Sequence, residues 1–468
     1  MTEPASLTVD VLVLGWGKGG KTFAAAMAAA GKRVAIVERS AAMYGGTCIN
    51  IGCVPTKTLI HDAELRRESD DAATSFAKAV TRRDALIAKL NDVNFHMLAD
   101  RDTVTVVDGQ ARFVSPHEVE VTPSAGGRGT NEVLRIRADL VVINTGAEPV
   151  RSEIPGADLD GVYDSTTIQH AEPFPKRLAI VGAGAIALEF ASMMRGFGSQ
   201  VTMLVRGDRL LPREDADVAE GVSKLLRDDG ISLRFGATVT EIVRSEAALR
   251  LTLDTDTGAE HLETDALLFA TGRRPATAEL GLDAAGIDTD EHGAITVDEQ
   301  LRTSASGVFA MGDVRGGAQQ TPLSLDDHRV VLDAVTGEGL RRVSDRVAVP
   351  ATTFITPPFA SVGITADEAK QRGDVVRTVM VPVAGIKAMP RPKAVGDPRG
   401  FIKFVVDART DLILGARLLH VDAQEVINLI ALAMRAKVTA TELRDGIWTH
   451  PSSTEALNEV LGQLGDPH

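Results

Sequence analysis

The chain contains two cysteines, Cys48 and Cys53, and both lie in the glycine-rich segment 45–57. Gly45 and Gly46 let the backbone approach a ligand closely, and a helix starting here would favour thiolate over thiol. A disulfide between residues five apart is short and strained, hence easily reduced, and it would stabilise the fold by only about 2 kcal/mol. The spacing therefore favours a redox pair. One alternative is a buried thiol pair. The other is half of a metal site, but the sequence has no third cysteine and no nearby pair of histidines to complete the ligand set.

A glycine turn near the N-terminus predicts a dinucleotide site. Gly15, Gly17 and Gly20 lie between an apolar run and an alanine-rich stretch, and the next apolar run ends at Glu38. In a strand–turn–helix unit such glycines allow a tight turn and close approach to a pyrophosphate at the helix N-terminus. Glu38 is placed to accept hydrogen bonds from a ribose. The alternative, an ordinary tight turn, is weakened by an acid at this spacing.

A second unit of the same kind follows, with Gly182, Gly184 and Ala187 in the turn. Arg206 follows its second strand, which ends at Val205, in place of an acid, and Arg209 lies three residues on. A guanidinium there would hold a 2′-phosphate, whereas an acid would hold a ribose diol. Solvated surface arginines are the alternative. We therefore expect the first site to keep its dinucleotide and the second to take NADPH, with NADH possible.

The rest of the chain indicates a duplicated α/β architecture with a third part. The length of 468 residues suggests about three domains. Asp108-Gly109 is a hairpin signal, and residues 123–129 read as a loop and hairpin tip. After about Val349 the pattern changes to strands and then to an amphipathic helix. On that helix one face carries Val426, Ile427, Ile430 and Met434.

Charge and hydropathy exclude some classes of protein. Lys and Arg number 50 against 64 Asp and Glu, a net charge of −14, which disfavours binding to nucleic acid or to anionic membranes. No apolar run reaches the roughly 18 residues of a membrane span. The first ten residues carry acids and no basic region, so we expect no signal peptide and a cytoplasmic location.

Together these motifs resemble those of the flavoprotein disulfide reductases, which include glutathione reductase, dihydrolipoamide dehydrogenase and mercuric reductase. The resemblance spans nearly the whole chain. Its further segments are Thr271–Pro275, 303–313, Thr356–Pro358 and His450-Pro451-x-x-x-Glu455. Residues 15–22, 42–47, 49–51 and 58–63 are most similar to one branch, the bacterial enzymes of reactive-chlorine resistance that reduce hypothiocyanous acid.

The resemblance implies an α/β fold with two Rossmann-like domains, for FAD and NADPH, and a C-terminal α+β dimerisation domain. The expected boundaries are 1–148 with 275–348 for FAD, 149–274 for NAD(P)H, and 349–468 for dimerisation. The FAD residues would be Gly15, Gly17, Gly20, Glu38, Gly46, Thr47, Lys57, Thr145, Gly146 and Asp313. The NADPH residues would be Gly182, Gly184, Ala187, Arg206, Arg209 and Gly272.

The resemblance also assigns catalytic roles. Cys53 would face the flavin as the charge-transfer thiolate, and Cys48 would attack the substrate. Lys57 and Glu189 would pair beside the flavin N5. One departure concerns Ala185, because many relatives carry a tyrosine there that covers the nicotinamide pocket.

His450 and Glu455 form the remaining catalytic pair. A histidine oriented by a carboxylate is a general acid–base unit, although a histidine on a loop is by itself weak evidence. The resemblance places this pair in the active site of the other subunit, which implies a homodimer with shared sites. The C-terminal residues 461–468 lack the cysteine pair of mercuric reductases. We expect no bound metal.

The sequence thus predicts an oxidoreductase that uses NAD(P)H and FAD to reduce a small oxidant, with hypothiocyanous acid as the favoured substrate. The alternatives within enzymes are a low-molecular-weight disulfide and Hg(II) or Cu(II). A further alternative is a dihydrolipoamide dehydrogenase-type subunit of a multienzyme complex.

Overall fold

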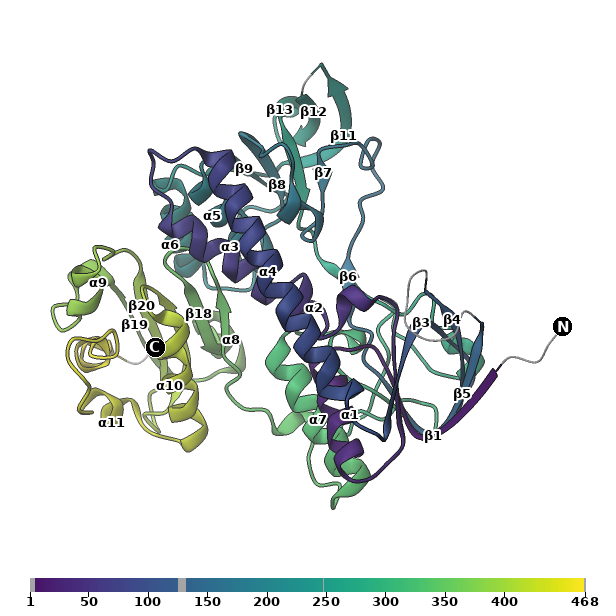
Figure 1. The fold of residues 1–468 in the computed structure, drawn as a ribbon. Coiled ribbons are helices and arrows are strands. Elements are labelled where there is room, and N and C mark those ends of the chain that lie inside the picture. Colours follow the sequence, from purple (N-terminus) through teal and green to yellow (C-terminus); the bar gives the residue numbers. More distant parts are fainter. Residues whose placement is uncertain (1–4, 125–131, 247, 467–468) are drawn as a thin grey trace. The chain divides into compact units, whose positions relative to one another are not determined.

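The computed structural model describes residues 5–124, 132–246 and 248–466. The chain forms two compact units (Figure 1). Unit 1 consists of residues 1–58, 79–150 and 272–345, and unit 2 of residues 59–78, 151–271 and 346–468. The two units are the parts of the chain with the densest internal contacts, and they do not test the boundaries of the three predicted domains. Those boundaries stay predictions. Over the described residues, none of the helices is both long and apolar enough to cross a bilayer.

Unit 1 is built on a parallel sheet in which β3, β2, β1, β5 and β16 are neighbours in that order. β4 pairs antiparallel with both β3 and β5 and so adds a meander on one side. A short ribbon joins β6 to β15. The strands are β1 (Ala5–Leu14), β2 (Val34–Glu38), β3 (Val104–Ser115), β4 (Glu118–Pro123), β5 (Leu134–Ile143), β6 (Ala147–Pro149), β15 (Arg273–Pro275) and β16 (Val308–Ala310).

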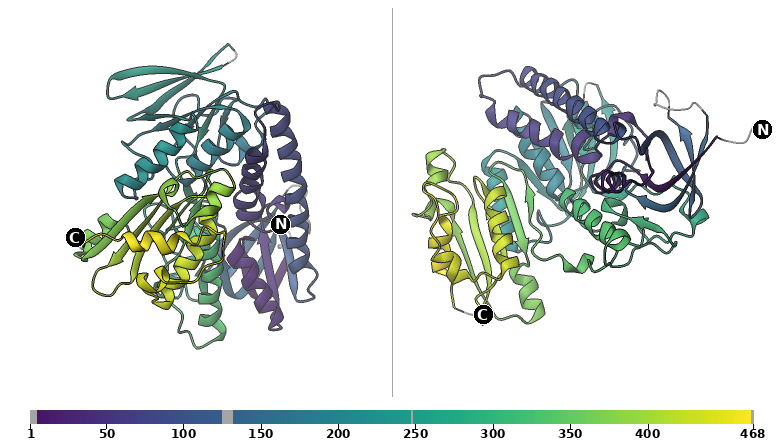
Figure 2. Two further views of the ribbon diagram at one scale, coloured as in Figure 1. Left: turned by 90° about the vertical axis from the view of Figure 1, so that its left-hand side faces the viewer. Right: turned by 60° about the horizontal axis from the view of Figure 1, so that its bottom comes forward.

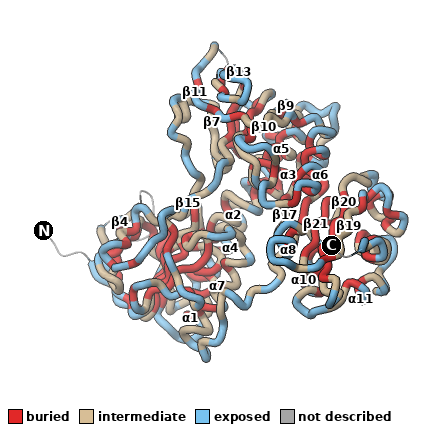
Figure 3. The backbone as a smooth tube through the Cα atoms, turned by 180° about the vertical axis from the view of Figure 1, so that it is seen from behind, coloured by how far each residue is buried: buried red, intermediate tan, exposed pale blue. Residues whose placement is uncertain are grey.

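The apolar runs of the first dinucleotide unit form the centre of this sheet. Val11 and Val13 of β1 face one core, together with Phe23 of a helix. Leu12 and Leu14 face the other core, which the meander covers. A strand buried on both faces must be apolar throughout, as these runs are. Figure 3 shows the buried backbone in this sheet in red.

Helices α1 and α7 pack against each other on the first of these faces (Figure 1). The sequence after the first glycine turn therefore forms the helix predicted for it. The helices with residues in unit 1 are α1 (Lys18–Ala29), α2 (Thr47–Asn50), α3 (Cys53–Leu65), α4 (Ala72–Ala99) and α7 (Thr321–Thr336). The end of α3 and the start of α4 belong to unit 2.

The hairpin predicted at Asp108-Gly109 is wrong, because both residues lie inside the continuous strand β3. Gly109 instead allows β4 to pack closely against β3, because a Cβ at this position would lie 2.5 Å from the carbonyl oxygen of Thr122 on β4. Asp108 accepts a hydrogen bond from the Tyr44 hydroxyl at 2.6 Å. The hairpin tip predicted within residues 123–129 falls largely on positions outside the described residues.

Unit 2 contains a second parallel sheet, in the order β10-β9-β8-β14-β7, and an antiparallel sheet β11-β12-β13. The second glycine turn follows β8, as the sequence predicts. The elements are β7 (Val162–Tyr163), β8 (Arg177–Val181), α5 (Ala185–Phe197), β9 (Gln200–Val205), α6 (Ala216–Asp228), β10 (Ser232–Phe235), β11 (Thr238–Ser245), β12 (Ala248–Thr255), β13 (Gly258–Thr264) and β14 (Ala266–Phe269).

The C-terminal segment of unit 2 forms an antiparallel sheet in the order β17-β18-β21-β20-β19, with α10 packed on β18 and β21 (Figure 2). The predicted apolar face of this helix is buried at Val426, Ile427 and Ile430, and Met434 packs against the same core. The elements are β17 (Ala351–Thr353), β18 (Phe359–Gly363), α8 (Ala366–Arg372), β19 (Val376–Pro382), α9 (Pro390–Ala394), β20 (Phe401–Asp407), β21 (Ile413–Leu419), α10 (Ala423–Ala436), α11 (Ala440–Arg444) and α12 (Ala456–Val460).

Candidate active site

The two cysteines lie at the beginnings of two helices, Cys48 in the first turn of α2 and Cys53 as the first residue of α3. Both are free thiols, and the Cys53 thiol hydrogen-bonds with that of Cys48. This bond, together with the Thr321 hydroxyl and the charges of Lys21 and Lys57, lowers the pKa of Cys48 to about 6, against the opposing effect of burial. Conversely, the same bond raises the pKa of Cys53. The Cys53 sulfur also lies 3.9 Å from the Thr321 hydroxyl oxygen.

Two thiols in hydrogen-bond contact release their protons in two steps, the first easily and the second with difficulty. The pair therefore carries one negative charge near neutral pH and has a nucleophilic sulfur available. The contacts of the structure favour this charge on Cys48, whereas the sequence resemblance assigns the flavin-facing thiolate to Cys53. The roles of the two sulfurs and their redox-active disulfide stay predictions.

The first glycine turn is packed against Asn144, a residue that the sequence analysis missed. The Asn144 side chain accepts a hydrogen bond from the Gly20 amide at 2.8 Å and donates one to the Met311 carbonyl at 2.6 Å. A Cβ at Gly15, whose φ is +94°, would lie 2.5 Å from the Asn144 carbonyl oxygen. The turn can therefore take this path only with glycine. Asn144 immediately follows β5, so its position depends on the pairing of β5 with β1.

Glu38 lies at the end of β2 and is buried. Its carboxylate accepts hydrogen bonds from the backbone amides of Trp16, at 3.0 Å, and Ser40, at 3.3 Å. Burial nevertheless raises the pKa of Glu38 to about 7. A carboxylate held in this way next to the turn can accept further hydrogen bonds from hydroxyl groups of a ribose.

Asp313 follows β16, next to β5 in the sheet. Burial raises the pKa of Asp313, while the charge of Arg273 lowers it. The backbone of this segment is fixed by Asp327 on α7, a fully buried residue that the sequence analysis also missed. Asp327 accepts hydrogen bonds from the Gly312 amide at 2.6 Å and from Arg315 at 3.0 Å.

Thr145 and Gly146 lie between β5 and β6. The Thr145 hydroxyl donates to the Ala276 carbonyl at 2.9 Å, and the Ala276 amide donates to the Gly146 carbonyl at 3.0 Å. The predicted FAD residues Gly15, Glu38, Thr145, Gly146 and Asp313 therefore gather at the carboxyl ends of parallel strands, where dinucleotides bind in open α/β sheets.

The segment that carries the two cysteines, residues 45–57, packs against the first glycine turn at Gly46. Gly46 has a φ of +78°, and a Cβ there would lie 2.8 Å from the Cα of Gly17. Asn50, which the sequence analysis did not single out, donates hydrogen bonds to the carbonyls of Tyr44 and Gly46, both at 2.9 Å. Thr47, the first residue of α2, lies between Gly46 and Cys48. The thiols are thus held beside the predicted dinucleotide site.

These residues fit an FAD. Helix α1 begins without a side-chain cap and without an acid in its first turn, which leaves its N-terminus suited to a pyrophosphate. Glu38 and Asp313 supply acceptors for hydroxyl groups of the ribose and the ribityl chain.

The second glycine turn is more open than the first. A Cβ at Gly184 would meet no atom within 4 Å, although one at Gly182 would lie 2.6 Å from the Ala270 carbonyl oxygen. Ala187 is fully buried where α5 packs onto the turn. Arg206 is exposed after β9, and the Arg209 guanidinium donates to the Pro212 carbonyl at 3.3 Å. Arg206 is therefore available for a 2′-phosphate, whereas Arg209 is half-buried and already bonded to Pro212.

His450 and Glu455 form a hydrogen-bonded pair in unit 2, with 2.9 Å between Nδ1 and Oε1. This bond and one from the Ser452 amide hold the pKa of Glu455 below its usual range. The His450 side chain is 72% exposed, so most of its ring is open to solvent.

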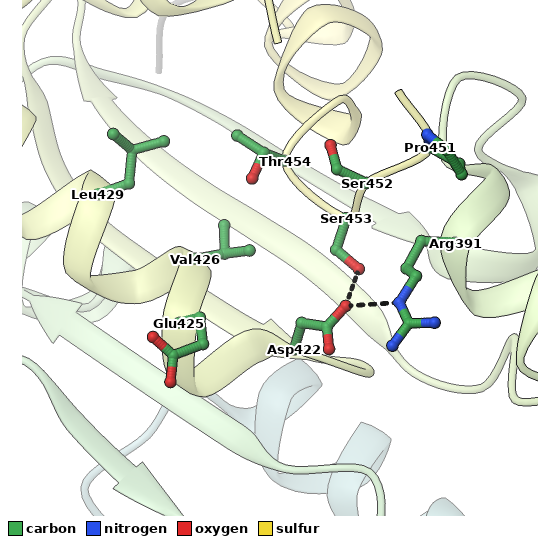
Figure 4. A pocket seen from close by; sticks show the side chains of 9 residues that line it. All are labelled: Arg391, Asp422, Glu425, Val426, Leu429, Pro451, Ser452, Ser453 and Thr454. Carbon is green, nitrogen blue, oxygen red and sulfur yellow. Dashed lines mark hydrogen bonds and ion pairs between the residues drawn. The ribbon is translucent and has the colours of Figure 1, made fainter. Parts of the chain in front are cut away.

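A pocket of about 280 Å³ adjoins the His450 loop (Figure 4). Inside it, Asp422 accepts hydrogen bonds from Arg391 at 3.2 Å and from Ser453 at 2.9 Å. Its lining consists of Arg391, Asp422, Glu425, Val426, Leu429, Pro451, Ser452, Ser453 and Thr454. None of these was predicted as a site residue, and the pocket does not include the cysteines.

Three predicted residues are divided between the two units. Lys57 belongs to unit 1, whereas Glu189 belongs to unit 2, where it accepts a hydrogen bond from the Phe354 amide at 2.9 Å. Gly272, assigned to NADPH, falls in unit 1, where its carbonyl accepts from the Val150 amide at 3.1 Å. The Lys57–Glu189 pair and the role of Gly272 stay predictions. Over the described residues, no group of His, Cys, Asp and Glu is arranged to hold a metal ion.

Comparison with protein families identifies the class. Residues 9–327 match the family described as pyridine nucleotide-disulphide oxidoreductase, and residues 349–461 match its dimerisation domain. The chain belongs to the pyridine nucleotide-disulphide oxidoreductase family. It is therefore an oxidoreductase of the flavoprotein disulfide reductase type, which uses FAD and NAD(P)H. The predicted fold, with two dinucleotide-binding domains and a dimerisation domain, is confirmed.

Two relatives and one solved structure match this chain over nearly their whole length. The chain is 44% identical to the probable pyridine nucleotide-disulfide oxidoreductase RclA of Escherichia coli (strain K12), covering 97% of this chain and 98% of that protein. It is 33% identical to a glutathione reductase of Burkholderia cepacia, over 95% of this chain and 97% of that protein. The solved structure of the HOCl-induced flavoprotein disulfide reductase RclA from Escherichia coli matches with a TM-score of 0.89 and 43% identity, covering 97% and 99% of the two chains. The predicted resemblance is thereby confirmed.

Proposed function

We propose that this enzyme reduces hypothiocyanous acid to thiocyanate with electrons from NAD(P)H, as a defence against reactive chlorine species. The observation that carries the proposal is the contact between Cys48 and Cys53, which holds the pKa of Cys48 near 6. Such a pair offers a thiolate at neutral pH together with a second thiol to displace the product. The likeness to RclA, a protein described as HOCl-induced, supports an oxidant as substrate.

The chemistry balances as a two-electron reduction. The thiolate of Cys48 attacks the substrate sulfur, a sulfur–sulfur bond forms, and the sulfur–oxygen bond breaks as hydroxide takes a proton and leaves as water. Cys53 then attacks the Cys48 sulfur, which releases thiocyanate and closes the Cys48–Cys53 disulfide. The substrate gains two electrons and the two thiols lose them. FAD, when bound, passes two electrons from NAD(P)H to this disulfide.

His450 is proposed as the source of the proton for the leaving hydroxide. Glu455 accepts the Nδ1 hydrogen bond and so orients the ring with Nε2 free to donate. We infer that the enzyme is a homodimer in which His450 serves the thiols of the other subunit. The dimerisation domain at residues 349–461 and the exposure of His450 support this arrangement.

Mixing two inactive variants tests the shared site. Dimers of Cys48→Ser and of His450→Ala should regain activity after subunit exchange, because half of the sites in a mixed dimer combine an intact thiol pair with an intact histidine. His292→Ala, at an exposed histidine, serves as the control and should keep full activity. Lack of recovery after proven exchange would show that His450 acts within its own chain.

Cu(II) is a second candidate acceptor, because RclA of Escherichia coli has been solved as a Cu(II) complex. A thiol pair can reduce Cu(II) by one electron per ion, so that two ions would be consumed for each disulfide formed. This reaction would need no proton from His450, and a His450→Ala variant would separate the two substrates.

A comparison of kcat/KM values tests the proposed substrate directly. NADPH oxidation would be measured with hypothiocyanous acid, oxidised glutathione, lipoamide, Hg(II) and Cu(II). We expect the highest kcat/KM with hypothiocyanous acid, and a loss of at least about a thousandfold in Cys48→Ser, because that variant lacks the attacking sulfur. A higher value with any other acceptor would overturn the assignment.

A further inference from the structure

Lys21 is a buried cation of unit 1 for which the reaction above has no use. It lies on α1 directly after the glycine turn, and it is only 5% exposed. Its ammonium donates hydrogen bonds to the Gly45 carbonyl, at 3.4 Å, and to the side-chain oxygen of Asn94. Both acceptors are neutral, so neither compensates the charge. A buried charge without an ionic partner is costly and is usually retained for a reason.

The charged groups around Lys21 point to that reason. Burial and, to a smaller extent, the neighbouring charge of Lys18 lower the pKa of Lys21 to about 8. The group that acts in the opposite direction is Cys48, through its negative charge. Besides the Thr321 hydroxyl, the groups that act on Cys48 are Cys53 and Lys57, both on α3, and Lys21 itself. Lys21 and the Cys48 thiolate therefore stabilise each other.

Asn94 fixes the ammonium in this position. It lies on α4, and its amide nitrogen donates to the Leu90 carbonyl at 2.7 Å, which turns the side-chain oxygen toward Lys21. Asn94 also packs on the cysteine segment, because a Cβ at Gly45 would lie 3.0 Å from its Cγ. Lys21 and Asn94 thus hold the backbone three residues before Cys48.

A phosphate contact is the alternative role for this lysine. Residues 15–22 have the G-x-x-x-x-G-K-[ST] spacing of a phosphate-binding loop, in which the lysine reaches a phosphate. Here, however, the ammonium bonds to Gly45 and Asn94 and is covered by protein. A lysine serving a phosphate outside the turn would be exposed to that phosphate.

We propose that Lys21 is a positioning residue of the thiol pair, which fixes the turn before Cys48 and supplies the buried positive charge that stabilises its thiolate. The proposal deepens the proposed function, because it rests on Cys48 as the attacking thiol. It also explains how a small oxidant could be reduced without a dedicated binding cleft: the rate would depend on the thiolate more than on substrate recognition.

Alkylation of Cys48 tests this proposal without any substrate. In the Cys53→Ser holoenzyme Cys48 is the sole cysteine, so iodoacetamide labelling as a function of pH reports its thiolate alone. Adding Lys21→Met should slow labelling at pH 7 about fivefold and move the midpoint of the pH profile upward. Lys32→Met, at an exposed lysine beyond the end of α1, should change neither. Flavin content and melting temperature show whether each variant is folded.

A second variant keeps the proposal testable if Lys21→Met does not fold. Asn94→Asp leaves Lys21 in place but gives it a carboxylate partner, and it should slow labelling in the same direction. Unchanged labelling in a folded, flavin-loaded variant would overturn the proposal. Loss of flavin with unchanged labelling would instead assign Lys21 to a phosphate. Failure of the enzyme to reduce hypothiocyanous acid would refute the proposed substrate but leave this result unaffected.

Discussion

The two glycine turns of the chain have the same spacing but different surroundings. The first is enclosed: Asn144 packs against Gly15 and Gly20, and the acid after the second strand, Glu38, is buried. The second is open at Gly184, and Arg206 after its second strand is exposed.

This difference matches two modes of cofactor use. An enclosed, preorganised turn suits a cofactor that stays bound through many turnovers. An open turn with an exposed arginine suits a dinucleotide that must enter and leave in each cycle. We propose that the residues packed around each turn adapt the same sequence motif to its use. A variant at an enclosed glycine of the first turn and one at the open glycine of the second should therefore have different effects.

Alanine at the first glycine of one turn and at the open glycine of the other should give the largest difference. Gly15→Ala forces a side chain into a positive φ and against the Asn144 carbonyl. We expect it to lower the free energy of unfolding by more than about 2 kcal/mol and to yield protein without flavin. Gly184→Ala should keep its flavin and its stability and raise the KM for NADPH. Absorbance spectra and denaturant unfolding measure both effects, and equal flavin loss in the two variants would contradict the comparison.

Arg206→Ala should have an intermediate effect. Removal of a guanidinium from the 2′-phosphate should raise the KM for NADPH about tenfold. The KM for NADH, which lacks that phosphate, should stay unchanged and provides the internal control. Equal kcat/KM values for NADPH and NADH in the wild-type enzyme would show that Arg206 stays in solvent and does not bind the 2′-phosphate.

The smallest expected effect is the pH dependence of FAD binding to the apoprotein. Burial raises the pKa of Glu38 to about 7, so below that pH the carboxyl is protonated and accepts ribose hydrogen bonds less well. Affinity for FAD should therefore increase several-fold between about pH 6 and pH 8 and then level off. Flavin fluorescence quenching measures it. A Glu38→Gln variant should bind more weakly with a flat pH profile, and a slope as steep as that of the wild type would assign the titration to another group.

The sequence was sufficient to predict both turns, because strand, glycines and helix are contiguous in each. It was likewise sufficient for the cysteine pair, whose spacing is local. It could not reveal Asn144, Thr321 or Asp327, because they reach the site through strand pairing and helix packing over long stretches of chain. Thr321 contacts Cys53 from 268 positions away. Only the Thr-Pro pair at the start of α7, typical of a helix N-terminus, could have drawn attention to it.

The wrong prediction at Gly109 shows that a local sequence signal can be overridden by tertiary packing. Asp-Gly is a local hairpin signal, but tertiary packing decided the outcome, since β4 passes so close that glycine is needed within a continuous strand. A glycine can allow a turn, the close approach of a ligand or the close approach of a neighbouring strand. A single sequence does not distinguish these three roles.

The central claim is that electrons from NAD(P)H reach the sulfurs of Cys48 and Cys53. The most direct test is to count alkylated cysteines by mass spectrometry in the denatured holoenzyme, first as oxidised, then after one equivalent of NADPH without oxygen, and finally after hypothiocyanous acid. The account predicts no labelled cysteines, then both, then none again. Labelling that does not change with NADPH would contradict it.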